Sequence, residues 1–165
     1  MPRMVLALKQ KLAGLLTKEF SGCECEKCFQ SKLLSHLRDC MSRPSHIDGL
    51  GFFGYRPRKP DLVYTNDGEK LLIECKLLKG NNGCEVRNAF SQLIEYMILG
   101  GYRDGCVLCY DKRDSADEFS DVDRWFLKQL PTVNHKGEGI SISLLHLFES
   151  KDDDGQKFCC KCYDE

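Results

Sequence analysis

The segment 59–80 constrains the fold of this chain most, because it contains two adjacent strands with charged residues inside the second. Residues 62–65 are rich in β-branched and aromatic side chains, residues 66–68 (Asn-Asp-Gly) are a strong turn signal, and residues 69–78 form a longer, largely apolar run. This pattern predicts a β-hairpin. Both faces of its second strand carry apolar residues, which is typical of a central strand that is covered on both sides.

Two charged residues, Glu74 and Lys76, interrupt this second strand. Successive side chains of a strand point to opposite faces, so both are expected on the face of Leu72 and Leu78, with Cys75 on the other face. Burying an uncompensated charge is strongly unfavourable. We therefore expect these two charges to be paired or to have a function.

The rest of the chain completes one domain, residues 1–165, of the α/β class. Helical periodicity predicts helices over 3–19, 29–41, 85–99 and 122–130, and apolar runs predict strands over 50–56, 105–110 and 140–148. The order is helices, three strands, helix, strand, helix, strand (a core of the type αβββαβ). A helix between the third and fourth strands makes that pair parallel, so we expect a mixed central sheet flanked by helices. The acidic tail from residue 149 is expected to be ordered only through its cysteines.

Composition limits the cellular location and the kind of partner. No apolar segment is long enough to predict a membrane span. Lys9 and Lys11 interrupt the apolar N-terminal segment, which favours an amphipathic helix over a signal peptide, so we expect an intracellular protein, cytoplasmic or nuclear. The net charge is −1, so any contact with nucleic acid must depend on a local basic surface.

Asp61 begins the first strand of the hairpin, and the turn brings it alongside Glu74. Two convergent carboxylates form an oxygen-rich site suited to Mg²⁺ or Mn²⁺. Zinc is not expected there, because no His or Cys side chain is predicted on that face. Lys76 is expected to orient or deprotonate an attacking water and to offset the charge of a phosphoryl transition state. The alternative is a structural Glu–Lys pair in an ordinary polar hairpin.

These residues resemble the signature of the PD-(D/E)XK nucleases, the restriction-endonuclease-like superfamily. The matching residues are Pro60-Asp61 in one strand and Glu74-x-Lys76 in the next, and the predicted order of elements over roughly residues 30–110 is similar to the family core. The resemblance implies metal-dependent hydrolysis of nucleic-acid phosphodiester bonds, with DNA favoured over RNA, leaving 5′-phosphate and 3′-hydroxyl ends.

The same resemblance implies roles for individual residues. Asp61 and Glu74 are the expected metal ligands, with the carbonyl oxygen of Cys75 as a third, and Lys76 is the expected catalytic lysine. Gln92 on the following helix is expected to support the water or Glu74. The alternative for Gln92 is a solvent-facing helix residue.

Other features of the family concern residues on the helices. Gln92 and Tyr96, predicted on a flank of their helix, are similar to the Gln-x-x-x-Tyr of the RecB-like branch. Family members often add an acidic residue from the first helix. The candidates here are Glu19, Glu24 and Asp39. A histidine on that helix, as in the cap-snatching branch, would change the metal preference, and His36 is available.

A short basic stretch leads into the hairpin and could hold phosphates beside the site. It comprises Arg56, Arg58 and Lys59, with Lys79 close by. The alternative is a solvated loop. No residue pattern predicts base-specific contacts. The slightly acidic balance of the chain favours a narrow contact surface or a partner that delivers the substrate, and a homodimer or larger complex stays open.

Eleven cysteines are an unusually high number for a presumed intracellular protein. The odd count argues against a disulfide framework. Two groups are closely spaced. They are Cys23, Cys25 and Cys28 near the start and Cys159, Cys160 and Cys162 near the end. Segments 23–28 and 159–162 could share a structural Zn²⁺, for instance through Cys25, Cys28 and two C-terminal cysteines.

Two alternatives to zinc stay open for these cysteines. An iron–sulfur cluster would resemble the staple of some RecB-like nucleases, although that staple uses one cysteine before the core and three after it. Reduced cysteines without any metal are the other alternative.

Two functions of other classes compete with a nuclease. One is a non-catalytic nucleic-acid-binding or assembly subunit with a nuclease-like fold and structural zinc. The other is a zinc-organised protein-interaction domain in which the hairpin has no role. The intact set of Asp61, Glu74 and Lys76 favours the enzyme, because a site that has lost its activity commonly lacks one of them.

Overall fold

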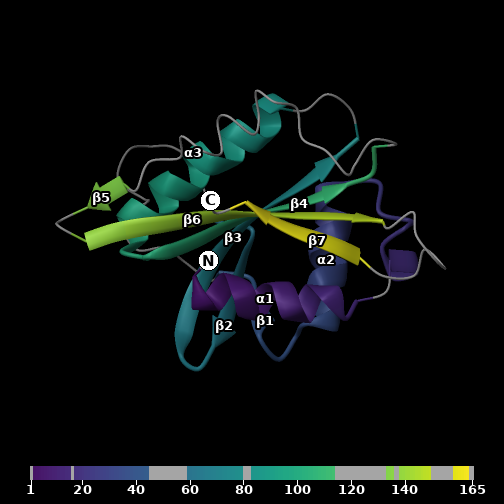
Figure 1. Cartoon of the computed structure of the whole chain (residues 1–165), viewed down its shortest axis with the longest axis horizontal. Helices are drawn as coiled ribbons and strands as arrows, with labels where there is room; N and C mark the ends of the chain where they lie inside the picture. Colours follow the sequence, from purple (N-terminus) through teal and green to yellow (C-terminus); the bar gives the residue numbers. More distant parts are fainter. Residues whose placement is uncertain are drawn as a thin grey trace.

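The computed structural model describes residues 2–15, 17–44, 59–79, 83–113, 133–135, 138–149 and 158–163. These residues form an α/β fold with a mixed sheet between helices (Figure 1). In this part of the chain the sheet has seven strands in the order β1-β2-β3-β4-β6-β5, and β7 lies beside β6. The predicted strand 50–56 and helix 122–130 lie outside the described residues.

The predicted hairpin is confirmed. Strands β2 (Leu62–Asn66) and β3 (Glu69–Leu78) pair antiparallel, with Leu62 opposite Ile73. Asp67 and Gly68 both have positive φ, 51° and 81°, which is the backbone conformation of the tight turns that match the twist of a hairpin. Asparagine, aspartate and glycine tolerate this conformation best, so this turn is a direct consequence of the local sequence.

The helix predicted over 29–41 is wrong at both ends. Helix α2 spans Glu26–His36, and strand β1 (Met41–Ser42) follows it. Met41 is buried and pairs with Tyr64 of β2, so contact with the hairpin determines the structure there and overrides the local helical pattern. The first helix also ends earlier than the predicted range 3–19. Helix α1 spans Arg3–Ala13, Gly14 follows it, and a short 3-10 helix covers Thr17–Glu19.

The crossover to the parallel part of the sheet is as predicted. Helix α3 (Gly83–Gly100) joins β3 to β4 (Asp104–Asp111), and these strands are parallel. Strand β6 (Glu138–Glu149) is parallel to β4, and β5 (Val133–His135) pairs antiparallel with its start. Strand β7 (Phe158–Tyr163) also pairs antiparallel with β6. Backbone pairing therefore orders part of the tail that was expected to depend on its cysteines.

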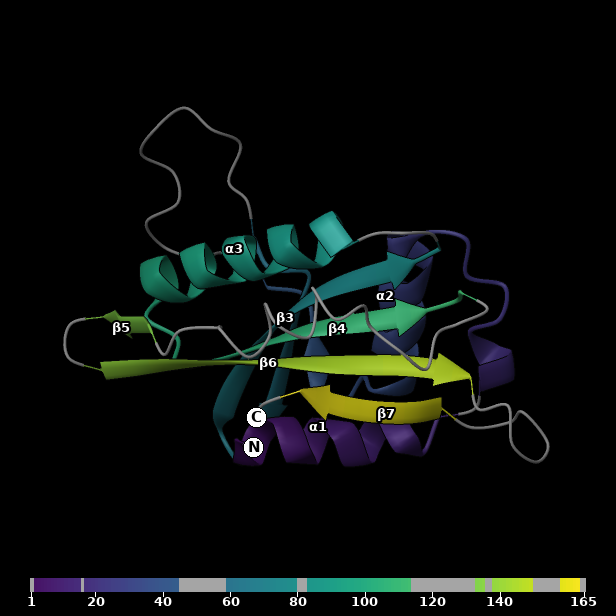
Figure 2. The same ribbon diagram turned by 45° about the horizontal axis from the view of Figure 1, so that its top comes forward.

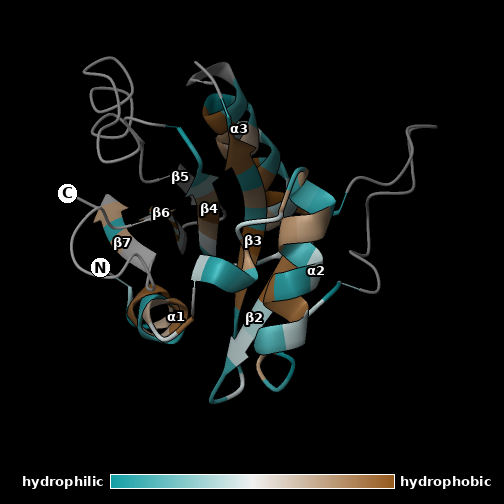
Figure 3. Cartoon of the chain, turned by 90° about the vertical axis from the view of Figure 1, so that its right-hand side faces the viewer, coloured by the Kyte–Doolittle hydropathy of each residue, from teal (hydrophilic) through white to brown (hydrophobic). Residues whose placement is uncertain are grey.

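Helices cover both faces of the sheet, as Figure 2 shows for α3 on one side and α1 on the other. Leu72 and Leu78 of β3 pack with Phe90 and Leu93 of α3. The alternate residues of β3, such as Ile73, belong to a second core that includes α1 and α2. Figure 3 shows the resulting hydrophobic character of β3. Both faces of this strand are therefore covered, as its sequence predicts. No helix in the described residues is long and apolar enough to cross a membrane.

Candidate active site

Asp61 lies at the point where β2 begins and reaches the edge of β3. Its Oδ2 accepts a hydrogen bond from the backbone N–H of Cys75 at 2.8 Å. Pairing between the two strands stops at Leu62 and Ile73. Beyond that pair, the Asp61 carboxylate supplies the hydrogen-bond acceptor that a paired strand would otherwise provide to β3. The N–H and C=O of an extended residue point to the same side, so the carbonyl of Cys75 also faces this edge.

Glu74 and Lys76 lie on the α3 face of β3, as predicted, since they alternate with residues that pack under α1 and α2. Glu74 is 5% exposed, and its Oε1 is 3.4 Å from the Lys76 Nζ. Its Oε2 is buried and has no hydrogen-bond partner in the described structure. A buried carboxylate oxygen without a donor is unfavourable, so a cation bound there would be stabilising.

Helix α2 supplies two further polar groups. Glu26 Oε2 lies 3.6 Å from the Lys76 Nζ, and the side chain of buried Gln30 hydrogen-bonds Asp61. The two residues are one helical turn apart and therefore share a face. Sequence reasoning missed both. The signal that could have found them is this polar pair beside the buried Phe29 and Leu33.

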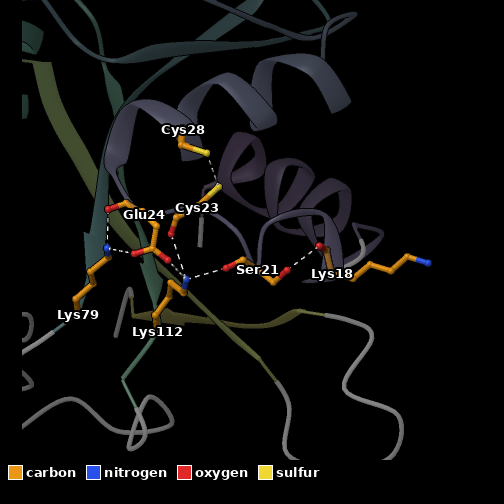
Figure 4. Close-up of polar contacts among 7 residues, drawn as sticks. All are labelled: Lys18, Ser21, Cys23, Glu24, Cys28, Lys79 and Lys112. Carbon is orange, nitrogen blue, oxygen red and sulfur yellow. Dashed lines mark hydrogen bonds and ion pairs between the residues drawn. The ribbon is translucent and has the colours of Figure 1, made fainter.

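The acidic candidates predicted near the first helix have other partners. Glu19 Oε2 lies 3.0 Å from His36 Nε2, so the histidine that the sequence offers as a metal ligand is engaged there as well. Glu24 pairs with Lys79 at 2.6 Å and with Lys112 at 3.6 Å (Figure 4). Asp39 is exposed beyond the end of α2. The acidic residue that the structure brings beside Lys76 is therefore Glu26.

The two residues predicted from α3 differ in their positions. Gln92 is half-buried, and the hydrogen bonds described for Glu74 and Lys76 do not include it. Tyr96 is 3% exposed and packs in the core between α3 and the sheet. The predicted position of Tyr96 on a flank is therefore wrong, because the apolar face of α3 is wider than the sequence pattern indicated.

Burial and crowding of like charges change the protonation of the site. Burial raises the pKa of Asp61, and burial together with Asp61 raises the pKa of Glu74 to about 7. Burial lowers the pKa of Lys76, but Glu74, Glu26 and Asp61 raise it more, so that its pKa lies above the usual value. Lys76 therefore stays an ammonium at neutral pH, which favours charge stabilisation over deprotonation of a water.

Asp61 and Glu74 carry oxygen donors of the kind that a hard divalent cation prefers. Asp61, Glu74 and Glu26 present three carboxylates against the single ammonium of Lys76, so the fully ionised site has an excess of two negative charges. Two carboxylates and a carbonyl oxygen are a sufficient protein contribution for Mg²⁺, which commonly keeps several waters. Within the described residues, no group of three or more His, Cys, Asp or Glu is placed to hold a metal ion.

A thiol shares this face of the sheet, contrary to the prediction. Cys109 of β4 is the register partner of Lys76 and is fully buried in the core under α3. Burial and Asp111 raise its pKa. A neutral, buried thiol is a poor zinc ligand, so the presence of Cys109 does not by itself make this face a zinc site.

Beyond Cys109, the end of β4 carries a buried polar network. Asp111 Oδ2 lies 2.9 Å from the Nε2 of His146 on β6 and 2.6 Å from Arg113 Nη2, and its Oδ1 accepts from Arg113 Nε at 2.8 Å. Burial raises the pKa of Asp111, but His146 and Arg113 lower it more, to below its usual value. The network connects the ends of β4 and β6 beside the candidate site.

The predicted basic surface is described only in part. Arg56 and Arg58 lie outside the described residues, Lys59 is exposed, and Lys79 is engaged with Glu24. Sequence reasoning missed Arg43, an exposed residue after β1 whose charge opposes, in small part, the burial that raises the pKa of Asp61. Among the described residues, Arg43 is thus an exposed cation whose charge reaches Asp61, and Lys59 is an exposed cation close to it in the sequence.

The two cysteine groups have different surroundings. Cys23 and Cys28 place their sulfur atoms 3.2 Å apart, while Cys25 is exposed. Cys160 and Cys162 of β7 are half-buried and lie near the buried Cys106. The described residues therefore do not form the predicted shared metal site, and the side chain of Cys159 lies outside them.

Comparison of this chain with protein-family models, with curated proteins and with solved structures finds no match.

Proposed function

We propose that this chain hydrolyses phosphodiester bonds of nucleic acid with the help of Mg²⁺ or Mn²⁺. The observation that carries the proposal is the convergence of Asp61, Glu74 and Glu26 on one ammonium, that of Lys76. A purely structural Glu–Lys pair would need one carboxylate. The excess negative charge and the unpartnered Oε2 of Glu74 are more simply explained by a cation-binding role.

Asp61 and Glu74 are the residues that would hold the ion, with the carbonyl oxygen of Cys75. The ion, when bound, supplies Lewis-acid activation of a phosphoryl oxygen and of water. The Cys75 N–H and the Gln30 amide fix the orientation of the Asp61 carboxylate. These contacts pre-organise the site before any ligand is present.

Lys76 provides fixed positive charge in this scheme. Its Nζ is held between Glu74 and Glu26, and its side chain is 13% exposed, so the ammonium is largely shielded from water. An ammonium in that position stabilises the negative charge that develops on the phosphoryl group in the transition state. The raised pKa of Lys76 keeps it protonated in this role.

The substrate is nucleic acid, with DNA favoured over RNA, on the basis of the resemblance to PD-(D/E)XK nucleases. Arg43 and Lys59 are exposed and can contact backbone phosphates next to Asp61. A near-neutral chain with few cations beside the site is expected to bind nucleic acid weakly and with a modest salt dependence.

The test is cleavage by the purified chain of linear, circular and single-stranded DNA and of RNA, each with Mg²⁺, Mn²⁺ or EDTA. We expect cleavage that requires the metal and that falls at least about 100-fold in Lys76→Ala. The matched control is Lys70→Ala, which removes an exposed lysine of the same strand and should retain wild-type activity. Circular dichroism verifies that both variants fold.

Two results would overturn this proposal. One is the absence of cleavage by the wild-type chain on every substrate with either metal. The other is equal cleavage by the wild-type chain and Lys76→Ala. Binding of nucleic acid without cleavage would instead support the non-catalytic binding subunit.

A further inference from the structure

The thiols of Cys23 and Cys28 face each other just before and inside the first turn of α2. Their sulfur atoms are 3.2 Å apart, and both cysteines are free (Figure 4). A disulfide bond is about 2.0 Å long, so a movement of about 1 Å would join them. Cys23 is fully buried and Cys28 is half-buried, so that a dissolved reagent reaches Cys28 before Cys23.

The loop that carries Cys23 is anchored from the ends of two central strands. Lys112, which follows β4, donates hydrogen bonds to the carbonyls of Ser21 at 2.8 Å and Cys23 at 3.1 Å. Lys79, which follows β3, donates to the carbonyl of Glu24 at 2.6 Å and pairs with its carboxylate (Figure 4). These contacts hold the Cys23 thiol in position opposite Cys28.

The different burial of the two thiols sets the order in which they are oxidised. Burial, with Cys28, raises the pKa of the Cys23 thiol to about 11, although Lys32 and Lys112 partly oppose this shift. Cys23 is therefore a poor first nucleophile, and the more accessible Cys28 is the first point of attack by an oxidant. The nearby lysines then favour loss of the Cys23 proton when its sulfur attacks.

This pair is also close in sequence to the candidate active site. Cys25 precedes the first residue of α2, and Glu26, in its first turn, lies 3.6 Å from the Lys76 Nζ. A bond between the anchored Cys23 and Cys28 would therefore fix the start of the helix that carries Glu26. Cys25 lies between the two in the sequence but is exposed, so it offers a matched control.

We propose that Cys23 and Cys28 form a redox-modification site, in which a hydroperoxide converts the two thiols into a disulfide that fixes the start of α2. The Cys28 thiol releases its proton, the thiolate attacks the terminal peroxide oxygen and becomes a sulfenic acid as the O–O bond breaks, and the other oxygen takes up the released proton and leaves as water or an alcohol. The Cys23 sulfur then attacks the Cys28 sulfur, the S–S bond forms, and hydroxide leaves and takes up the Cys23 proton as water. Two thiols are oxidised, and one peroxide is reduced.

The first test maps the disulfide in the full chain after treatment with hydrogen peroxide and blocking of the remaining thiols. Trypsin cleaves after Lys18, Lys27 and Lys32, so Cys28 leaves on peptide 28–32, separate from peptide 19–27. We expect these peptides to be joined in the wild-type chain and in Cys25→Ser. They should be separate in Cys23→Ala and Cys28→Ala. The result does not depend on any cleavage activity, so it can fail or succeed independently of the proposed function.

Several outcomes of this mapping would overturn the proposal. They are the absence of the joined peptides, their loss in Cys25→Ser, and a link from Cys28 to any other peptide. Zinc bound in stoichiometric amount and released by modification of Cys28 would also overturn it, because the close sulfur atoms would then belong to a metal site. If Cys23→Ala does not fold, Cys28→Ala carries the comparison, since Cys28 is only half-buried.

The second test measures the effect of the bond on α2. Closing this short loop should raise the Tm of the oxidised chain by about 5 °C relative to the reduced chain. Amide hydrogen exchange of residues 24–30 should slow by about tenfold on oxidation, and neither change should occur in Cys28→Ala. Equal exchange rates in the oxidised and reduced chains, with the disulfide present, would show that the bond does not fix the helix.

Discussion

The carboxylate of Asp61, the residue just before strand β2, accepts a hydrogen bond from the backbone N–H of Cys75 at 2.8 Å, beyond the first residue pair of the two strands. One side chain therefore completes the pairing of a central strand and presents negative charge to Glu74. The two roles depend on different properties of the carboxylate, since the hydrogen bond needs an acceptor oxygen and the cation site needs a negative charge. They can be separated by substitution.

Asp61→Asn should retain the fold and lose the metal. Asparagine keeps an acceptor oxygen for the Cys75 N–H but carries no charge, so we expect an affinity for Mn²⁺ at least about tenfold lower, with stability within about 1 kcal/mol of wild type. Asp61→Ala removes the acceptor as well. Its free energy of unfolding should therefore be lower by a further ~1–3 kcal/mol, which is the cost of leaving a buried donor unsatisfied. Titration calorimetry with Mn²⁺ and urea unfolding measure the two effects. Equal stability of both variants would contradict the role of the hydrogen bond.

Glu26→Gln should reduce activity more than stability. Its carboxylate lies 3.6 Å from the Lys76 Nζ, so the change removes one of the charges that hold the ammonium in place. Loss of such a supporting group commonly reduces activity about 10- to 100-fold. Glu19→Gln is a matched control, because Glu19 and Glu26 have similarly exposed side chains (36% and 37%), and Glu19 pairs with His36 instead. Equal cleavage rates of the two variants would contradict a role for Glu26.

Asp111→Asn should destabilise the chain strongly. Asp111 is 1% exposed and compensates Arg113, and breaking a buried ion pair from one side costs about 3–5 kcal/mol. Asp104→Asn on the same strand is the control, because burial and Glu69 raise the pKa of Asp104, so neutralising it should be harmless or slightly stabilising. Urea unfolding at pH 7 compares the two variants. A loss below about 1 kcal/mol for Asp111→Asn would show that the network is not structural.

The hairpin and the two faces of β3 could be predicted because both depend on local sequence. A period of two sets the faces of a strand, and Asn66-Asp67-Gly68 favours the positive φ of the turn. The parallel pairing of β3 with β4 followed from the helix between them. These predictions needed no knowledge of contacts between distant segments.

The contributions of α2 could not be predicted in the same way. Met41 leaves the helical pattern because it pairs with Tyr64, and Glu26 belongs to the site because α2 packs against the hairpin. Both contacts join segments that are far apart in the sequence. For the same reason the sequence pattern did not show that Cys109 would lie beside Lys76, since only the register of two strands determines it.

Glu74 should make the stability of the metal-free chain depend on pH. Burial and Asp61 raise its pKa from 4.5 to about 7, so the folded state holds a proton that the unfolded chain has released above pH 4.5. Protonation of Glu74 therefore stabilises the folded state relative to the unfolded chain, and this stabilisation is lost as the pH rises from about 4.5 to 7. The resulting decrease in the free energy of unfolding that Glu74 causes is at most about 3 kcal/mol.

Glu74→Gln separates this effect from every other titrating group. Glutamine does not ionise, so in EDTA we expect a smaller decline in stability between pH 5 and pH 8 than in the wild-type chain, measured by urea unfolding. Glu69→Gln, an exposed change on the same strand, should keep the wild-type decline. Mg²⁺ at pH 8 should stabilise the wild-type chain and leave Glu74→Gln unchanged, because binding to the folded state alone raises stability. A wild-type decline in Glu74→Gln, or equal stabilisation of both by Mg²⁺, would show that Glu74 is not the residue that links pH and metal binding to the fold.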